Sequence, residues 1–324
     1  MIRQVVFILL LTTSLAAASG QAPKSAPLPP ADIPFARLTA DAVVAVALGA
    51  GSIESADGIW IANPPAGTIV HIDAKANAAA TPLVAGAEPC GSLVAAFDSV
   101  WVPLCGDGTL ARLDPKTSKV TATLKMRLAS ADGRIASGVG SIWAITDRKG
   151  VLSRIDPATN AVVAEIYVAG GAHSVVLGSE ALWVTSEAGN LLTRVNPHNN
   201  EVVETIEVGP QPGRLAVGEG AVWTLNRGNG TVTRVDPATN KVVATIPLGE
   251  GAATGEIAAG LGSVWISAVG APIIRIDPRS NRAVQRFTGE GGGAVLVGHG
   301  SLWVAAGPLL TWRMDPLLVT AIRP

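Results

Sequence analysis

Residues 214–249 read RLAVGEGAVWTLNRGNGTVTRVDPATNKVVATIPLG and contain four short runs rich in β-branched residues, separated by turn signals. The runs are Arg214–Gly218, Ala221–Leu225, Thr231–Val235 and Lys241–Ile246. A Gly-x-Gly hairpin follows the first run, and Asp-Pro-Ala-Thr-Asn follows the third. Proline presets φ in such a turn, and asparagine tolerates the left-handed backbone that closes it. The stretch therefore predicts four consecutive antiparallel strands.

Copies of this stretch recur along the chain, and each carries a tryptophan in its second run. The tryptophans are separated by 41, 42, 40, 40, 42 and 38 residues; they are Trp60, Trp101, Trp143, Trp183, Trp223, Trp265 and Trp303. A period near 40 with strand-like units is typical of a β-propeller. We therefore predict an all-β fold: a seven-bladed β-propeller with four antiparallel strands per blade.

Two other residues recur in most repeats. The turn proline is preceded by Asp114, Asp156, Asp236, Asp277 and Asp315, with Asn196 in one repeat. An arginine stands two positions before each of these aspartates and before Asn196; the arginines are Arg112, Arg154, Arg194, Arg234, Arg275 and Arg313. Residues that every blade shares are expected to be structural. We therefore expect the aspartates to cap turns, and we look for chemistry where the repeat is broken.

The ends of the propeller must be joined, because an open ring exposes two sheet edges. Ala42–Gly49 matches the fourth strand of a repeat, so we predict that this N-terminal strand completes the last blade, whose own strands span about residues 294–314. The tail Leu317–Ile322 also reads as a strand and is the alternative.

The N-terminus has the pattern of a secretory signal peptide. A short positive segment, Met1–Gln4, precedes the apolar run Val5–Leu11 and then small residues. We predict a signal peptide over residues 1–20, a Pro-rich linker over 21–41 and a single propeller domain over 42–324. The mature protein is expected in the periplasm or outside the cell.

The composition excludes several classes of partner. Without Arg3 the chain keeps 23 basic against 25 acidic residues, so no basic excess favours nucleic acid. No cysteine near the cleavage region could accept a lipid, and no further stretch is apolar enough for a membrane span. We expect no membrane anchor, a monomer, and a small molecule or protein as partner.

The repeat Val222–Gly249 resembles the YVTN repeat family, and the resemblance covers roughly residues 43–314. Members of that family are typically secreted seven-bladed propellers. The chain is also similar to virginiamycin B lyases, propeller enzymes that linearise a cyclic lactone antibiotic by elimination with the help of Mg²⁺. Fold and export are what the first resemblance implies, and lyase chemistry is what the second implies.

The lyase motifs are incomplete in this chain. That family carries Glu-x-His at the start of one inner strand and Trp-Phe-Thr-Glu on the next strand. Here His173 matches the histidine, but Gly171 and Ser186 stand where the two glutamates belong, and Gly133 stands where a second histidine belongs. Glu187 follows Ser186, so alternation would point its side chain to the other side of the strand. Mg²⁺ is expected only under the lyase hypothesis, and no other cofactor is predicted.

His173 breaks a ring of glycines at the starts of the inner strands. The aligned residues are Gly51, Gly91, Gly133, His173, Gly213, Gly255 and Gly293, followed by Ser52, Ser92, Arg134, Ser174, Arg214, Glu256 and Ala294. Ends of second strands reach the same channel mouth. Arginine offers fork-like donors to anions. The predicted ligand-binding residues are Arg134, His173, Arg214, Glu256, Asp147 and Arg227, and the catalytic candidates are His173 and Glu187; no metal site is predicted.

The two cysteines are the other break. Cys90 begins the inner strand of blade two and Cys105 ends the adjacent strand. In a hairpin centred near Phe97-Asp98, residues whose numbers add to about 195 face each other, and the cysteines meet that condition. An exported compartment favours a disulfide there. Closing such a loop adds roughly 3 kcal/mol of stability.

The sequence is compatible with three functional hypotheses. The first is an exported propeller that binds a ligand or protein through its channel mouth and upper loops. The second is a lyase or hydrolase with a divergent active site around His173, and the third is a quinone-cofactor dehydrogenase, although the repeats lack its tryptophan-docking signature. Carboxylates within reach of His173 would favour an enzyme, whereas an isolated imidazole would exclude one.

Overall fold

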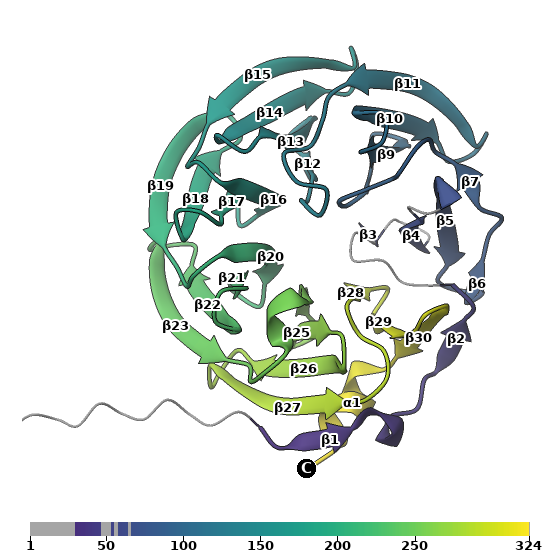
Figure 1. The fold of residues 1–324 in the computed structure, drawn as a ribbon, viewed down its shortest axis with the longest axis vertical. Coiled ribbons are helices and arrows are strands. Elements are labelled where there is room, and N and C mark those ends of the chain that lie inside the picture. Colours follow the sequence, from purple (N-terminus) through teal and green to yellow (C-terminus); the bar gives the residue numbers. More distant parts are fainter. Residues whose placement is uncertain (1–29, 47–52, 55–57, 64–65, 324) are drawn as a thin grey trace, which may run out of the picture.

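Seven sheets form a ring in the computed structural model, which describes residues 30–46, 53–54, 58–63 and 66–323 (Figure 1). Each blade has four antiparallel strand positions, two of the sheets have a fifth strand, and the chain passes through blades one to seven in order. The predicted seven-bladed all-β propeller is confirmed. The predicted signal peptide, residues 1–20, lies outside the described residues.

The inner strands of blades one to seven are β3 (Ile53–Glu54), β8 (Val94–Ala96), β12 (Ala136–Gly138), β16 (Ala172–Gly178), β20 (Pro212–Gly218), β24 (Glu256–Gly260) and β28 (Val295–Gly298). The second strands are β4 (Gly58–Asn63), β9 (Ser99–Leu104), β13 (Ser141–Asp147), β17 (Ala181–Ser186), β21 (Ala221–Asn226), β25 (Ser263–Ala268) and β29 (Ser301–Gly307). Each of the seven tryptophans lies on one of these second strands.

The third strands are β5 (Thr68–Asp73), β10 (Thr109–Asp114), β14 (Val151–Asp156), β18 (Leu191–Asn196), β22 (Thr231–Asp236), β26 (Ala271–Asp277) and β30 (Leu310–Met314). The outer strands are β6 (Ala78–Ala79) with β7 (Leu83–Val84) in blade one, then β11 (Lys119–Lys125), β15 (Ala161–Tyr167), β19 (Glu201–Glu207), β23 (Lys241–Pro247), β27 (Arg282–Thr288) and β2 (Ala42–Val44).

The ring is closed by the N-terminal strand, as predicted. β2 pairs antiparallel with β30, with Ala42 opposite Arg313 and Val44 opposite Thr311. The alternative, a closing strand at residues 317–322, is wrong: the helix α1 spans Pro316–Ala321. Asp315 caps this helix by accepting from the Leu317 N–H at 2.8 Å, and proline occupies the first turn, where its missing N–H leaves nothing unpaired.

A short segment before β2 also joins the sheets. β1 (Asp32–Pro34) pairs in parallel with the outer strand β27 and is followed by a 3₁₀ turn, η1 (Phe35–Arg37). A second 3₁₀ turn, η3 (Ala252–Thr254), leads into blade six. Among the described residues, no helix has the length and hydropathy that crossing a membrane requires.

Each repeated tryptophan fills the space between neighbouring sheets. Six of the seven side chains are fully buried, and Trp60 is 5% exposed. The Trp183 indole N–H donates to the Gly178 carbonyl at 3.1 Å, and the Trp223 indole donates to the Gly218 carbonyl at 2.9 Å. The polar atom of the ring is therefore satisfied inside the core, which removes the penalty for burying it.

The repeated arginine ties five of the blades to the next, whereas Arg275 of blade six donates within its own blade. Arg194 lies over the Trp183 ring at 5.4 Å and donates to Asn240 Oδ1 of blade five at 2.9 Å. Arg313 of blade seven donates to Asn77 Oδ1 of blade one at 2.9 Å, so the same contact also closes the ring. Since these contacts join consecutive blades, the arginines are structural, as expected.

The repeated aspartates cap turns, also as expected. Asp156 Oδ1 accepts from the Ala158 N–H at 2.8 Å, and Asp236 Oδ1 accepts from the Ala238 N–H at the same distance. These backbone hydrogen bonds hold the pKa of both carboxyls below the usual range.

Cys90 and Cys105 form a disulfide, with Cα atoms 5.8 Å apart. The expected register holds where Val94 faces Trp101, but it has moved by two residues where Pro89 faces Leu104. Gly91 lies between these positions at a φ of +62°, where the backbone leaves the regular strand. The pairing is therefore as predicted, although the simple hairpin register does not extend to the cysteines.

Candidate functional site

The channel mouth is formed where inner strands begin and second strands end. Two glycines of the predicted ring leave room for their neighbours there. A Cβ on Gly213 would lie 2.4 Å from Arg227 Nε, and a Cβ on Gly133 would lie 2.5 Å from the His173 carbonyl oxygen. The glycines therefore allow the Arg227 side chain and the blade-four backbone to approach closely. Gly51 and Ser52 of the ring lie outside the described residues.

β-Bulges re-aim the side chains of blades four and five at this mouth. In blade four, Ala172 faces Ser186 and Ser174 faces Thr185, so His173 is an extra residue with no partner on β17. In blade five, Pro212 faces Asn226 and Leu215 faces Thr224, so the pairing shifts by one residue around Arg214. Bulges bend a strand locally and commonly redirect side chains at sites.

His173 is buried against acidic groups. Its side chain is 2% exposed, its Nε2 lies 3.0 Å from Asp132 Oδ1, and its Nδ1 lies 2.7 Å from Ser174 Oγ. Glu187 Oε1 is 3.7 Å from the same Nε2. These distances fit a tautomer that donates to Asp132 and accepts from the serine hydroxyl. The imidazole is therefore not isolated, and both of its nitrogens are engaged.

Asp132 connects His173 to an arginine. Besides the imidazole, its carboxylate accepts from Ser130 Oγ at 2.6 Å and from Arg227 Nη2 at 2.7 Å. The hydrogen bond from His173, followed by those from Ser130 and Arg227, holds the pKa of Asp132 far below its usual range despite opposing desolvation. Arg227 also donates to Glu187 Oε1 at 3.1 Å.

A second ion-pair group crosses the channel. Arg134 of blade three pairs with Glu256 of blade six, and Arg214 Nε of blade five lies 3.5 Å from the other oxygen of Glu256. Glu256 is 1% exposed and the Arg214 side chain 6% exposed. Burial lowers the pKa of Arg214, and the Glu256 charge opposes that shift. Arg134, Arg227 and Asp132 also act on this pKa through their charges, so the two groups form one cluster.

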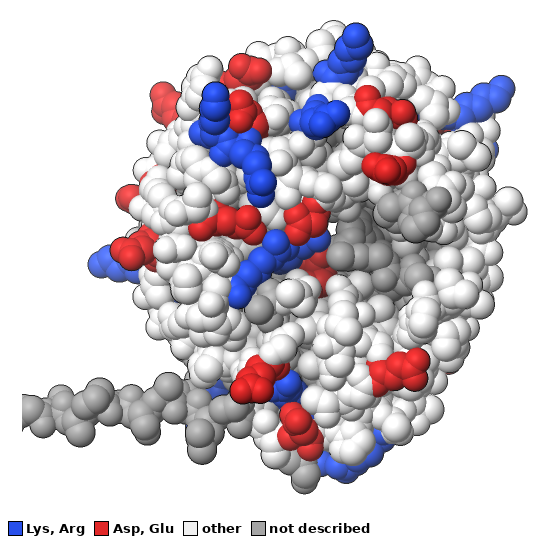
Figure 2. Space-filling model, in the orientation of Figure 1, with Lys and Arg blue, Asp and Glu red and all other residues white. Residues whose placement is uncertain are grey.

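We call these residues the mouth cluster: Asp132, Arg134, Arg148, His173, Glu187, Arg214, Arg227 and Glu256. Figure 2 shows acidic and basic side chains meeting near the centre of the ring. Four atoms of the cluster are buried and have no hydrogen-bond partner among the described residues: the nitrogens Arg134 Nε, Arg214 Nη1 and Arg227 Nε, and the oxygen Glu256 Oε2, which lies 3.5 Å from Arg214 Nε. A buried donor without an acceptor lowers stability. The three arginine nitrogens therefore lack acceptors that a ligand could supply.

Most of the predicted site residues meet in this cluster. Arg134, His173, Arg214, Glu256, Arg227 and Glu187 are in it. Asp147 makes no hydrogen bond or ion pair with them among the described residues; its Oδ1 accepts from the Lys149 N–H at 2.8 Å, which caps its own turn. Glu187 faces His173 although strand alternation placed it on the other side, because β17 ends at Ser186 and the bulge moves His173.

Asp132 and Arg148 were missed by the sequence prediction. Asp132 stands immediately before the ring glycine Gly133. The seven residues at that position are Ala50, Cys90, Asp132, Ala172, Pro212, Thr254 and Gly292. Asp132 is the one charged residue among them, so the same repeat alignment contained the signal one position earlier.

The mouth cluster does not fit a magnesium ion. The described residues contain no group of three or more His, Cys, Asp or Glu side chains placed to hold a metal. Asp132 and Glu187 are paired with the Arg227 guanidinium, at 2.7 and 3.1 Å. A dication beside that guanidinium would meet an unfavourable charge, and Mg²⁺ prefers unshared carboxylate oxygens.

Solved structures that resemble this chain include three β-propellers. A streptogramin B lyase is 20% identical with a TM-score of 0.65, covering 82% of this chain and 92% of its own. Virginiamycin B lyase from Staphylococcus aureus is 18% identical with a TM-score of 0.66, covering 83% and 94%. BamB from Moraxella catarrhalis is 12% identical with a TM-score of 0.62, covering 85% and 98%.

These similarities show the fold alone. No family model matches the chain, and no curated protein does. Membership of the YVTN repeat family therefore stays a prediction. The propeller fold shared with virginiamycin B lyases is shown, and shared chemistry is a separate question.

Proposed function

We propose that this protein is an exported binding propeller whose mouth cluster holds a small organic anion, with a dicarboxylate as the simplest candidate. The observation that carries the proposal is the set of arginine nitrogens left without acceptors beside the channel: Arg134 Nε, Arg214 Nη1 and Arg227 Nε. An anion that draws these guanidinium groups into new pairs would supply those acceptors.

The charge balance of the cluster supports the same ligand class. Four arginines meet three carboxylates, so one positive charge remains when the imidazole is counted as neutral. The Arg134 side chain is 22% exposed and that of Arg227 is 26% exposed, so both reach solvent at the mouth. Guanidinium binds carboxylate in a fork-like, charge-assisted geometry.

The enzyme hypothesis is supported by two carboxylates beside His173 Nε2, Asp132 Oδ1 at 3.0 Å and Glu187 Oε1 at 3.7 Å. An acid–histidine pair of this kind can serve acid–base catalysis. However, the second nitrogen of His173 lies 2.7 Å from Ser174 Oγ, and the imidazole is 2% exposed. A substrate proton could not reach either nitrogen without rearrangement. We therefore assign His173 the role of positioning Asp132 beside Arg227.

Export is part of the proposal. The Cys90–Cys105 disulfide is compatible with an oxidising compartment, where such bonds persist. The apolar run Val5–Leu11 after a positive start is the sequence feature that supports a signal peptide. We place the mature chain in the periplasm or outside the cell.

Isothermal titration calorimetry with succinate tests the binding function. We expect heat of binding that weakens as salt is raised, and at least a tenfold loss of affinity in Arg227→Gln, because a charge-assisted hydrogen bond contributes about 1.5–3 kcal/mol. Arg282→Gln is the matched control, since Arg282 is an exposed residue on the outer strand β27 and makes none of the ion pairs of the cluster, whose blade-six member Glu256 lies on the inner strand β24. Equal affinity of both variants, or no heat with succinate, would contradict the proposal.

The lyase alternative has its own test. Chromatography of virginiamycin B after incubation with the protein and Mg²⁺ should show only the intact cyclic compound. A linear product that disappears in His173→Gln would replace the binding proposal with an enzyme.

A further inference from the structure

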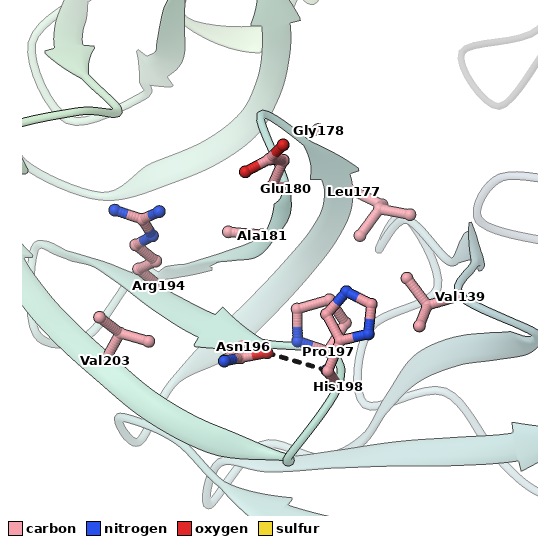
Figure 3. A pocket seen from close by; sticks show the side chains of 10 residues that line it. All are labelled: Val139, Leu177, Gly178, Glu180, Ala181, Arg194, Asn196, Pro197, His198 and Val203. Atoms are coloured by element: carbon pink, nitrogen blue, oxygen red, sulfur yellow. Dashed lines mark hydrogen bonds between the residues drawn. The ribbon is translucent and has the colours of Figure 1, made fainter.

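A groove lies at the opposite end of blade four from the mouth cluster. Strand β16 runs from Ala172 at the mouth to Gly178 at this groove, which has a volume of about 830 Å³. Its lining residues are Val139, Leu177, Gly178, Glu180, Ala181, Arg194, Asn196, Pro197, His198 and Val203. Figure 3 shows these side chains around the groove, with Arg194 on one side and His198 on the other.

In blades two and three, the repeated arginine uses the Nε–Nη2 edge of its guanidinium inside its own blade. Arg112 donates from Nε to Ser99 Oγ at 2.8 Å and from Nη2 to the Phe97 carbonyl at 3.3 Å. Arg154 makes the same pair of contacts, to Ser141 Oγ at 2.8 Å and to the Val139 carbonyl at 3.4 Å. The edge that could bind a carboxylate in a fork is therefore occupied in these blades.

Blade four leaves this edge unoccupied. Ala181 stands where blades two and three have serine, so Arg194 Nε has no hydroxyl to meet. Arg194 donates only from Nη1, to the Pro237 carbonyl at 2.8 Å and to Asn240 Oδ1 at 2.9 Å; its Nε and Nη2 have no hydrogen-bond partner among the described residues. These two bonds also fix the guanidinium, so its position is set before any ligand arrives.

Blade five provides the contrast. It also has alanine at the serine position, Ala221, and Arg234 makes the same two Nη1 contacts, to Pro278 and Asn281. The Nε of Arg234 is buried and unpaired. Arg194, in contrast, lines the groove, and its Nε is not among the buried unpaired atoms. Of the two arginines, Arg194 is the one that presents its free edge to a space large enough for a ligand.

The rest of the groove is suited to an apolar body. Val139 and Leu177 lie on one side, and Val203, itself 50% exposed, lies on the outer strand. The Glu180 carboxylate also lines the groove and repels an anion. The anionic end of a ligand is therefore expected against Arg194, with its apolar part along the valine and leucine side chains.

We propose that this groove binds an organic carboxylate with an apolar tail, whose two oxygens accept from Nε and Nη2 of Arg194. The fork geometry matches a carboxylate, and the groove volume lies in the range of small-molecule sites. The site is separate from the mouth cluster, so either proposal can fail without the other.

Calorimetry with octanoate tests the groove, with acetate and inorganic phosphate as ligands that lack the tail. We expect octanoate to bind and the two small anions to bind at least tenfold more weakly. Ala181→Ser should weaken octanoate binding at least tenfold, because it restores the hydroxyl that occupies Nε in blades two and three. Ala221→Ser is the matched control in blade five and should leave the affinity unchanged.

A second pair of variants covers the case in which Ala181→Ser disturbs the blade. Val203→Glu places a negative charge in the groove and should abolish octanoate binding, whereas Val243→Glu, at the equivalent and 49% exposed position of blade five, should not. Absence of octanoate binding, equal effects of the two serine variants, equal effects of the two glutamate variants, or binding of acetate as tight as octanoate would each overturn the proposal.

Discussion

Blades four and five have the same framework contacts, yet they contribute different charges to the channel mouth: a carboxylate from blade four and two arginines from blade five. Trp183 and Trp223 donate to equivalent carbonyls, at 3.1 and 2.9 Å, and Arg194 and Arg234 reach equivalent asparagines in the next blade. Both inner strands are bulged near their starts. The backbone frame is thus the same in both blades.

The two blades differ at the channel mouth, at positions outside the repeated tryptophan, arginine and turn residues. Where blade four has His173, Ser174 and Glu187, blade five has Gly213, Arg214 and Arg227. Glu187 and Arg227 occupy equivalent places in adjacent blades and pair with each other at 3.1 Å. The comparison teaches that repeated residues build the propeller, and that complementary departures from the repeat build the site.

The largest effect should come from the shared frame. Trp183→Ala and Trp223→Ala are each expected to reduce the free energy of unfolding by about 3–5 kcal/mol, because each leaves a large cavity between sheets. Urea denaturation measures both. A loss below about 1 kcal/mol in either variant would show that the two blades do not depend on the same frame.

The next largest effect should come from Arg214, a charge that blade five has and blade four lacks. Glu256→Gln is expected to destabilise the protein by about 3 kcal/mol, because it leaves the buried Arg214 of blade five without its counter-charge. In an Arg214→Ser background, which gives blade five the residue of blade four, the same change should be less costly. Purely additive losses in urea denaturation would mean that Arg214 and Glu256 are not coupled.

A smaller, pH-dependent effect should follow from the contacts of blade four with Asp132. The pKa of Asp132 is lower in the folded than in the unfolded protein, so the ionised carboxylate stabilises the fold. That contribution is complete above the ordinary carboxyl pKa and is lost as the pH falls below it towards the folded value. Because the side chain is 46% exposed, solvent screening limits the contribution to about 1 kcal/mol.

Urea denaturation of Asp132→Asn between pH 7 and pH 3 measures this contribution. The wild type should be more stable than the variant at pH 7, and the difference should narrow as the pH falls. A difference that stays constant or widens on acidification would contradict the assigned pKa direction.

The sequence predicted the frame well because the frame is repeated. Tryptophan spacing was enough to place all seven second strands, and the match of Ala42–Gly49 to a fourth strand was enough to predict ring closure. The C-terminal tail was mistaken for a strand because Leu317–Ile322 is rich in residues that suit either structure. The cap by Asp315 and the proline after it favour the helix instead.

The site was predicted only in part, because it depends on backbone irregularities. His173, Arg214 and Glu256 were visible as departures from an aligned ring. Asp132 was missed because it lies in the connection before an inner strand, outside the two aligned positions that form the ring. The orientation of Glu187 was wrong because strand alternation does not account for the bulge at His173.

The smallest effect should come from a predicted site residue that the structure leaves outside the cluster. Asp147→Ala is expected to leave succinate affinity unchanged and to alter the free energy of unfolding by at most about 1 kcal/mol, because Asp147 only caps its own turn. A tenfold loss of succinate affinity in calorimetry would place Asp147 in the site and weaken the contrast between blades four and five.

The central claim is that the charges contributed by blades three to six bind an anion at the channel mouth. A crystal structure of the protein with bromosuccinate tests it most directly, because bromine gives an anomalous signal that locates the ligand. We predict a bromine peak at the channel mouth beside Arg134 and Arg227, with their guanidinium groups turned to the carboxylates. Bromine peaks confined to other surfaces, with the mouth cluster unchanged, would contradict the claim.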